Sequence, residues 1–167
     1  MQEADPPLDD AATDDALVDA LLALELLTRR ASGLAADAEA CRVRIAESLP
    51  VSQLCQVWRD GRLVAYGMVT QQTVTSWFVT AFAVHPSYRT AGVLRELLGG
   101  LASLIDALGI EVLWSYVYKA NPALLRLHRA LGFEVQRETA TGVEFCLPRI
   151  PSPGGGRLAR LLRSRRA

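Results

Sequence analysis

One stretch of the chain combines residue types that could hold a phosphate-bearing ligand. It runs from Val84 to Arg95 and reads VHPSYRTAGVLR, so that an apolar run leads through a short arginine-containing loop into a helical pattern. The first turn of a helix offers unpaired N–H groups and the positive end of the helix dipole, which together bind anions. Gly92 would let the backbone approach such a ligand closely. The same residue types also fit a junction that serves only packing.

A second stretch with chemical potential lies downstream, from Asn121 to Phe133, and reads NPALLRLHRALGF. Asn121 is a favourable helix cap and Pro122 suits the first helical position. The helix contains His128, whose imidazole can donate or accept a proton near neutral pH. Three leucines share the helical face of His128, so the alternative is an inward-facing histidine with satisfied hydrogen bonds.

Taken together, the two stretches resemble the coenzyme A motifs of the GCN5-related N-acetyltransferase (GNAT) superfamily. The first is similar to V-x-P-x-x-R-x-x-G-x-G/A, here VHPSYRTAGVL, and the second to N-x-x-A-x-x-L-Y-x-x-x-G-F, here NPALLRLHRALGF. The resemblance covers roughly residues 53–147. Neither motif alone is specific, but their order and register together indicate this superfamily.

The resemblance implies where an acetyl-CoA donor would bind. The loop amides would hold the pyrophosphate, and the pantetheine arm would pair with the central strand like an added strand. Such a site requires a cleft between the strands that end at Val84 and Tyr118. The implied donor-binding residues are Phe82, Ala83, Val84, Arg89, Thr90, Ala91, Gly92, Val93, Leu94, Arg95 and Asn121.

The resemblance also implies an activity, the transfer of an acetyl group from acetyl-CoA to a primary amine. The amine, on a small molecule, a peptide or a protein, would attack the thioester directly, and no metal would be needed. Backbone N–H groups of the central strand would polarise the thioester carbonyl. His128 stands where the family often has a tyrosine that protonates the departing thiolate, so it is the expected catalytic residue.

Two departures from the family pattern leave alternatives open. Leu94 replaces a small residue of the first motif, either because it belongs to the core or because the donor is a longer acyl-CoA or an acyl carrier protein. The central strand has Thr80 and Ala81 where the family often has a carboxylate that acts as the general base.

The general base is therefore unassigned, and a bound water, Tyr116, Tyr118 and Glu111 all remain candidates. His85 is expected to be a loop residue. Because the base is missing and the tyrosine is substituted, a non-catalytic protein of this fold that binds a ligand or a partner is a further alternative.

The elements that must position these residues predict an α/β fold of the α+β type, with a mixed central sheet flanked by helices. Helices are expected over residues 14–30, 35–48, 91–108 and 121–131. Strands are expected over residues 53–59, 63–70, 73–84, 111–118, 133–137 and 143–147. The strand over residues 73–84 is apolar on both faces, which is typical of the middle of a covered sheet.

Length and charge indicate one domain with charged ends. The chain has 167 residues, of which half are hydrophobic, and its formal net charge is zero, which gives no reason to expect nucleic acid. Residues 1–13 are expected to be an acidic tail, residues 14–150 the GNAT acyltransferase domain, and residues 151–167 a Pro/Gly linker with a basic tail. An alternative for the basic tail is a short amphipathic helix on an anionic surface.

Cysteine usage and the N-terminal composition indicate a cytoplasmic protein. Cys41, Cys55 and Cys146 lie far apart, and with two histidines in the chain a zinc site is not expected. The acidic start has the wrong charge for a signal peptide. The leucine-rich stretch over residues 16–27 is too short and too charged for a membrane span. Dimers are common in the superfamily, so a homodimer stays one option.

Overall fold

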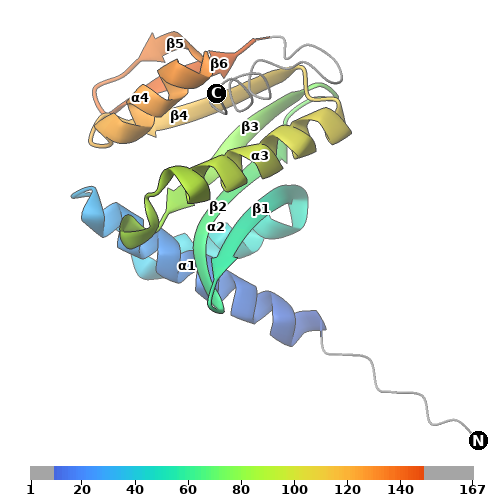
Figure 1. The fold of residues 1–167 in the computed structure, drawn as a ribbon, viewed down its shortest axis with the longest axis vertical. Coiled ribbons are helices and arrows are strands. Elements are labelled where there is room, and N and C mark those ends of the chain that lie inside the picture. Colours follow the sequence, from blue (N-terminus) through green and yellow to red (C-terminus); the bar gives the residue numbers. More distant parts are fainter. Residues whose placement is uncertain (1–9, 149–167) are drawn as a thin grey trace, which may run out of the picture.

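The computed structural model describes the backbone of residues 10–148 and the side chains of residues 14–148. The elements are α1 (Asp10–Ala31), α2 (Ala38–Ser48), η1 (Leu49–Val51), β1 (Ser52–Arg59), β2 (Arg62–Gln71), β3 (Ser76–Val84), η2 (Pro86–Tyr88), α3 (Ala91–Leu108), β4 (Val112–Tyr118), α4 (Pro122–Leu131), β5 (Glu134–Glu138) and β6 (Gly142–Leu147) (Figure 1). The predicted order of helices and strands is confirmed.

The six strands form one mixed sheet in the order β1-β2-β3-β4-β6-β5. β3 and β4 are parallel, and every other neighbouring pair is antiparallel. The predicted α+β fold with a mixed central sheet is therefore confirmed.

Helices cover both faces of the sheet. On one face, Leu21 of α1 and Ile45 of α2 pack with Tyr66 and Met68 of β2. On the other face, α3 and α4 pack over a second cluster that includes Leu97, and α3 lies across the front of the sheet in Figure 1. Burial of these apolar faces stabilises the three-layer arrangement, at roughly 25 cal/mol per Å² of apolar surface.

The two helices that carry the sequence motifs have the predicted caps. The Thr90 side chain accepts a hydrogen bond from the Val93 N–H at the start of α3. The Asn121 side chain accepts one from the Leu124 N–H at the start of α4. Gly109 ends α3 in the left-handed region at φ 63°, a conformation that disfavours residues with a Cβ.

β3 changes register and leaves β4 part-way along its length. In the pairing with β2, Val69 faces Val79 and Met68 faces Ala81, so Thr80 is the extra residue of a bulge. The pairing with β4 ends at Val79 and Ser115, although β3 continues to Val84 and β4 to Tyr118. The carboxyl-terminal ends of the two strands therefore separate.

Several boundaries differ from the expected ones. α1 begins at Asp10, four residues before the expected start at residue 14, and so includes the end of the expected acidic tail. β3 begins at Ser76, because Gln72 and Thr73 both donate their N–H groups to the Ser76 carbonyl and so form a turn. Residues 1–9 and 149–167, which include most of the expected acidic tail and all of the linker and basic tail, lie outside the described residues. Among the helices of residues 10–148, none is long and apolar enough to cross a membrane.

Candidate functional site

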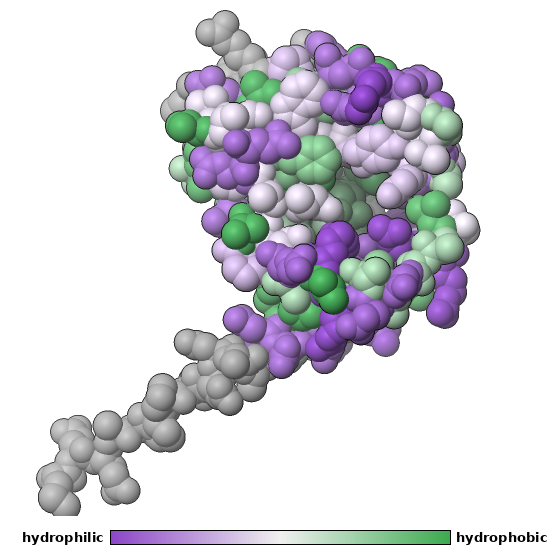
Figure 2. Space-filling model, turned by 180° about the vertical axis from the view of Figure 1, so that it is seen from behind, coloured by the Kyte–Doolittle hydropathy of each residue, from purple (hydrophilic) through white to green (hydrophobic). Residues whose placement is uncertain are grey.

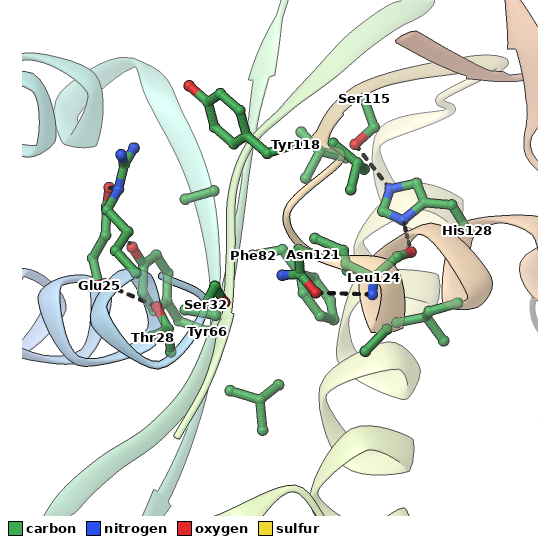
Figure 3. Close-up of a pocket in the computed structure, with 18 of the residues that line it drawn as sticks. Glu25, Thr28, Ser32, Tyr66, Phe82, Ser115, Tyr118, Asn121, Leu124 and His128 are labelled. Atoms are coloured by element: carbon green, nitrogen blue, oxygen red, sulfur yellow. Dashed lines mark hydrogen bonds and ion pairs between the residues drawn. The ribbon is translucent and has the colours of Figure 1, made fainter. Parts of the chain in front are cut away.

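A cavity of about 580 Å³ opens where β3 and β4 separate. Residues 78–84 of β3 and 115–118 of β4 line it, which is the predicted cleft between the ends of these strands. Helices from both faces of the sheet contribute side chains. In Figure 3, Glu25 and Thr28 of α1 lie on one side with Ser32, which follows α1, and Asn121, Leu124 and His128 lie on the other.

The opening turn of α3 lies at one end of this cavity and is open to a ligand. The first intrahelical bond runs from the Leu94 N–H to the Thr90 carbonyl at 3.1 Å, so the N–H groups of Ala91 and Gly92 precede it and have no intrahelical partner. A Cβ added at Gly92 would meet only the Thr90 Oγ1 at 3.9 Å. This turn can therefore accept an anion such as a pyrophosphate.

Leu94 does not fill the cavity. It is half-buried, packs against the core beneath α3 and contributes to the cavity wall. Val93 is buried, and Gly92 and Arg95 are exposed; these three residues are not part of the cavity lining. The predicted donor residues that line the cavity are Phe82, Ala83, Val84, Arg89, Thr90, Ala91, Leu94 and Asn121.

One edge of β3 is free beside the cavity. β2 pairs with the opposite edge as far as Val84, which faces Ala65. Since β4 pairs with β3 only as far as Val79, no strand of the described chain lies beside Phe82 and Val84 on the cavity side. Free strand edges bind extended ligands through main-chain hydrogen bonds.

His128 lines the cavity but is almost fully buried, and both of its ring nitrogens are engaged. Its Nδ1 is 2.9 Å from the Leu124 carbonyl oxygen and its Nε2 is 2.8 Å from the Ser115 Oγ (Figure 3). Because a carbonyl oxygen only accepts, Nδ1 donates to Leu124. Burial lowers the pKa of His128, although the hydrogen bond to Leu124 opposes this effect. Nε2 of the neutral ring therefore accepts a hydrogen bond from the Ser115 hydroxyl.

The surroundings of His128 are those of an inward-facing, satisfied histidine. Only 5% of the residue is exposed, and its ring packs against Phe133 and Phe145. Ser115 lies on β4 at the last position that pairs with β3, so its contact with Nε2 is at the point where the two strands separate. Direct proton donation by His128 remains a prediction, and in this geometry a proton would reach it through Ser115. Sequence reasoning missed Ser115, since nothing in a single strand residue indicates a partner thirteen positions away.

The structure separates the candidates for the general base. Glu111 is exposed just before β4 begins, at the end opposite the cavity, and is not part of the lining. The Tyr116 hydroxyl is 2.9 Å from both the Thr139 and the Thr141 Oγ1, and these bonds lower the pKa of Tyr116. Tyr118 lines the cavity and is 41% exposed. Tyr116 also lines the cavity, but its hydroxyl is held by the two threonines, so Tyr118 fits the geometry better than Tyr116 or Glu111.

A buried carboxylate on α1 lines the cavity at the end opposite α3. Oε1 of Glu25 accepts from Arg29 Nε at 3.0 Å, and Oε2 accepts from the Tyr66 hydroxyl at 3.1 Å and from Arg44. Burial, together with the Glu25 charge, raises the pKa of Tyr66. The sequence carried a signal for this cluster, because Glu25 interrupts the apolar pattern of α1.

A sequence model of the acetyltransferase (GNAT) family matches residues 21–133. The chain belongs to the GNAT family. The match begins within α1 and ends at Phe133, so it includes both coenzyme A motifs and the Glu25 cluster.

Curated relatives of this GNAT chain include the [ribosomal protein bS18]-alanine N-acetyltransferase of Escherichia coli strain K12. It is 31% identical over 78 residues, which cover 47% of this chain and 52% of that protein. The corresponding protein of Salmonella typhimurium strain LT2 is 31% identical over 74 residues, 44% of this chain and 49% of that protein. This chain thus matches about half the length of these curated relatives.

Solved structures share the fold of this GNAT chain. The PaiA N-acetyltransferase of Thermoplasma acidophilum, determined in complex with coenzyme A, aligns with a TM-score of 0.66 at 12% identity over 79% of this chain and 92% of that one. The ribosomal-protein-S18-alanine N-acetyltransferase of Escherichia coli aligns with a TM-score of 0.62 at 20% identity over 83% of this chain and 90% of that one. Among the side chains described, those of residues 14–148, no group of three or more could hold a metal ion.

Proposed function

We propose that this GNAT chain transfers an acetyl group from acetyl-CoA to a primary amine. One observation carries the proposal: a single cavity is reached from both faces of the sheet and has an open helix N-terminus at one end. The printed names of the relatives, which are N-acetyltransferases, support the same chemistry. In this proposal the domain spans residues 14–150, extended back to Asp10 by α1, and works in the cytoplasm.

The α3 side of the cavity would bind the donor. The pyrophosphate would accept hydrogen bonds from the first N–H groups of α3, with Arg89 beside it. The pantetheine arm would extend along the free edge of β3 at Phe82, Ala83 and Val84. Asn121 and Leu124 of α4 would border the arm on the side away from β3.

The reaction would proceed by direct attack. The amine nitrogen forms a bond to the thioester carbonyl carbon, the carbon–sulfur bond breaks, and one proton passes from the amine to the sulfur. Holding the two reactants together in one cavity provides much of the rate enhancement. Backbone N–H groups at the free edge of β3 would stabilise the oxyanion. Ser115 would pass the proton that the amine loses to Nε2 of His128, and the same pair would return it to the thiolate, so we propose that His128 acts through Ser115.

Leu94 supports acetyl-CoA over a longer acyl donor. Its side chain packs against the core beneath α3, and this packing accounts for a large residue at that position. A non-catalytic protein of this fold would bind coenzyme A and release no product, so turnover separates it from the proposed enzyme.

The experiment combines donor binding with product formation. Wild-type chain should bind acetyl-CoA in calorimetry and acetylate members of an amine panel, with products identified by mass spectrometry. Gly92→Asp places a carboxylate at the second position of α3, where it is compatible with the helix but repels a pyrophosphate. Binding should fall at least tenfold in this variant.

The matched control is Gly99→Asp in the same helix, where an added Cβ meets nothing within 4 Å. It should leave acetyl-CoA binding unchanged, and thermal unfolding should show both variants folded. Equal donor affinity in Gly92→Asp and wild type would refute the pyrophosphate site, and tight binding without any product would favour the non-catalytic alternative.

A further inference from the structure

We infer that the amine acceptor carries a carboxylate, which Arg29 and Arg44 bind at the α1 side of the cavity. The inference rests on the proposed function and adds the chemical class of the acceptor. Its basis is the cluster of Glu25, Arg29, Arg44 and Tyr66, hereafter the α1 cluster.

The charge of the α1 cluster is unbalanced. Among the described residues that line the cavity, the only charged side chains are three arginines and one carboxylate, Glu25. Arg89 lies at the start of α3, where the donor pyrophosphate would neutralise it. Arg29 and Arg44 both lie beside Glu25, so this end of the cavity keeps one surplus positive charge. Because burial lowers the pKa of His128, that ring is neutral and adds no charge to the cavity.

Both arginines have donors left for a ligand. Arg29 contacts Glu25 through Nε, and Arg44 contacts it through Nη2. A guanidinium has five N–H donors, and no other side-chain hydrogen bond of these two groups occurs within residues 14–148. The Arg29 and Arg44 side chains are 28% and 37% exposed, against 9% for Glu25. The carboxylate is thus more buried than the two guanidiniums, and all three residues line the cavity.

The α1 cluster is also held in place before any ligand binds. The Tyr66 hydroxyl, on a residue 1% exposed, fixes Oε2 of Glu25 from beneath. The Arg29 guanidinium lies 6.0 Å from the centre of the Tyr118 ring. Two guanidiniums braced in this way present the planar fork that matches a carboxylate, at a low entropic cost on binding.

A purely structural role fits the α1 cluster less well. The contacts of Glu25 do link α1, α2 and β2, since Arg44 lies on α2 and Tyr66 on β2. A half-buried bridge that served only this purpose would be most stable when its charges balanced, because desolvated surplus charge is costly. The surplus charge lies against a cavity, and an acceptor carboxylate would neutralise it. The same charge disfavours a polyamine acceptor.

The test compares acceptors that differ only in the carboxylate. Wild-type chain is assayed with acetyl-CoA and a set of α-, β- and γ-amino acids, each beside its carboxamide. A charge-assisted hydrogen bond is worth about 1.5–3 kcal/mol, so kcat/KM for the preferred amino acid should exceed that for its carboxamide by roughly ten- to a hundredfold. Equal kcat/KM values across all pairs would overturn the inference.

Variants then assign the preference to the α1 cluster. Arg44→Gln should raise KM for the amino acid about tenfold and leave KM for the carboxamide unchanged. The control is Arg42→Gln on the same helix, where the arginine instead pairs with Asp15 and Asp19 of α1. This control should leave both KM values unchanged. If Arg44→Gln does not fold, Arg29→Lys replaces it, because it keeps the charge while losing the fork.

The outcomes separate this inference from the proposed function. An equal effect of Arg44→Gln on amino acid and carboxamide would show that the cluster only supports the fold and would overturn the inference. Donor binding and amine acetylation without a preference for acids would overturn the inference alone. Absence of acetyl-CoA binding in the wild-type chain would overturn the proposed function and the inference with it.

Discussion

At the scale of single residues, Ser115 and His128 form the polar pair nearest to the point where β3 and β4 separate. His128 donates to a backbone carbonyl at Nδ1, which fixes the tautomer and leaves Nε2 to accept from Ser115. In these contacts the Ser115 hydroxyl resembles a hydroxyl that is activated by a neighbouring histidine base. Because the ring is buried and neutral, it suits proton acceptance better than proton donation.

The buried His128 predicts how stability depends on pH. Burial lowers its pKa from the ordinary value of 6.5, so between 6.5 and that lower pKa the unfolded chain binds more protons than the folded one. The contribution of His128 to the free energy of unfolding should therefore be largest above pH 6.5 and should decrease as the pH falls below that value. The fall due to His128 should be on the order of 1 kcal/mol between pH 7 and 5.5, measured by urea unfolding.

The matched variants for this prediction are His128→Gln and His85→Gln. His128→Gln should flatten the pH dependence in that window. Slight burial and the Arg62 charge also lower the pKa of His85, which lies near the surface, so His85→Gln should change the slope less. Parallel pH curves for wild type and His128→Gln would show that the ring does not stay neutral in the folded chain.

Some of these residue roles could be predicted from the sequence, and others could not. The helical face of His128 could be read from its spacing to leucines, and the structure places the ring inward as that spacing indicated. Ser115 and Glu25 could not be assigned, because their partners lie 13 and up to 41 positions away. Hydrogen bonds between distant segments leave no local pattern in one sequence.

At the scale of elements, local chemistry explains what the sequence predicted well. Thr90 and Asn121 cap their helices, and Gly109 ends α3, by contacts within a few residues. The bulge at Thr80 depends instead on pairing with β2, and the separation of β3 from β4 depends on two strands far apart in the chain. Pairing register between distant strands is not encoded in either strand alone, so the shape of the cleft could only come from the structure.

The hairpin of β5 and β6 gives a prediction at this scale. A Cβ at Gly142 would lie 2.7 Å from Cε1 of Tyr116, whose hydroxyl is held by Thr139 and Thr141. Gly142→Ala should lower the free energy of unfolding by about 1–3 kcal/mol, because the ring must shift and give up its hydrogen bonds to the two threonines. Urea denaturation measures the change.

Gly99→Ala is the control for this substitution. It adds the same methyl group in the interior of α3, where nothing lies within 4 Å, and should raise stability by about 0.5–1 kcal/mol. In the double variant Gly142→Ala/Tyr116→Ala, the Gly142 change should cost much less than it does alone. A Gly142→Ala protein as stable as wild type would mean that the β5–β6 turn is looser than its contacts indicate.

At the scale of the whole molecule, the cavity joins the two faces of the sheet. The end that we propose for the donor is built from α3 and α4, the other end from α1, α2 and Tyr66 of β2, and the separated strands lie between them. A molecule built in this way can hold both reactants at once. The N-terminal helices are therefore part of the site as well as a cover for the sheet.

This arrangement predicts a ternary complex and sequential kinetics. Double-reciprocal plots at varied acetyl-CoA and amine should intersect, because both reactants must be bound before the acetyl group moves. The Ser115–His128 pair provides the natural competing mechanism, in which Ser115 is acetylated first and the plots are parallel. Ser115→Ala distinguishes the two mechanisms. In direct transfer, this variant should reduce kcat by about 10²- to 10⁴-fold at most, which is the usual contribution of a proton-transfer group. A measurable rate should therefore remain. Parallel plots, a coenzyme A burst without amine, and complete loss of turnover in Ser115→Ala would together establish an acyl-enzyme, and the two-sided cavity would then serve the two reactants in turn.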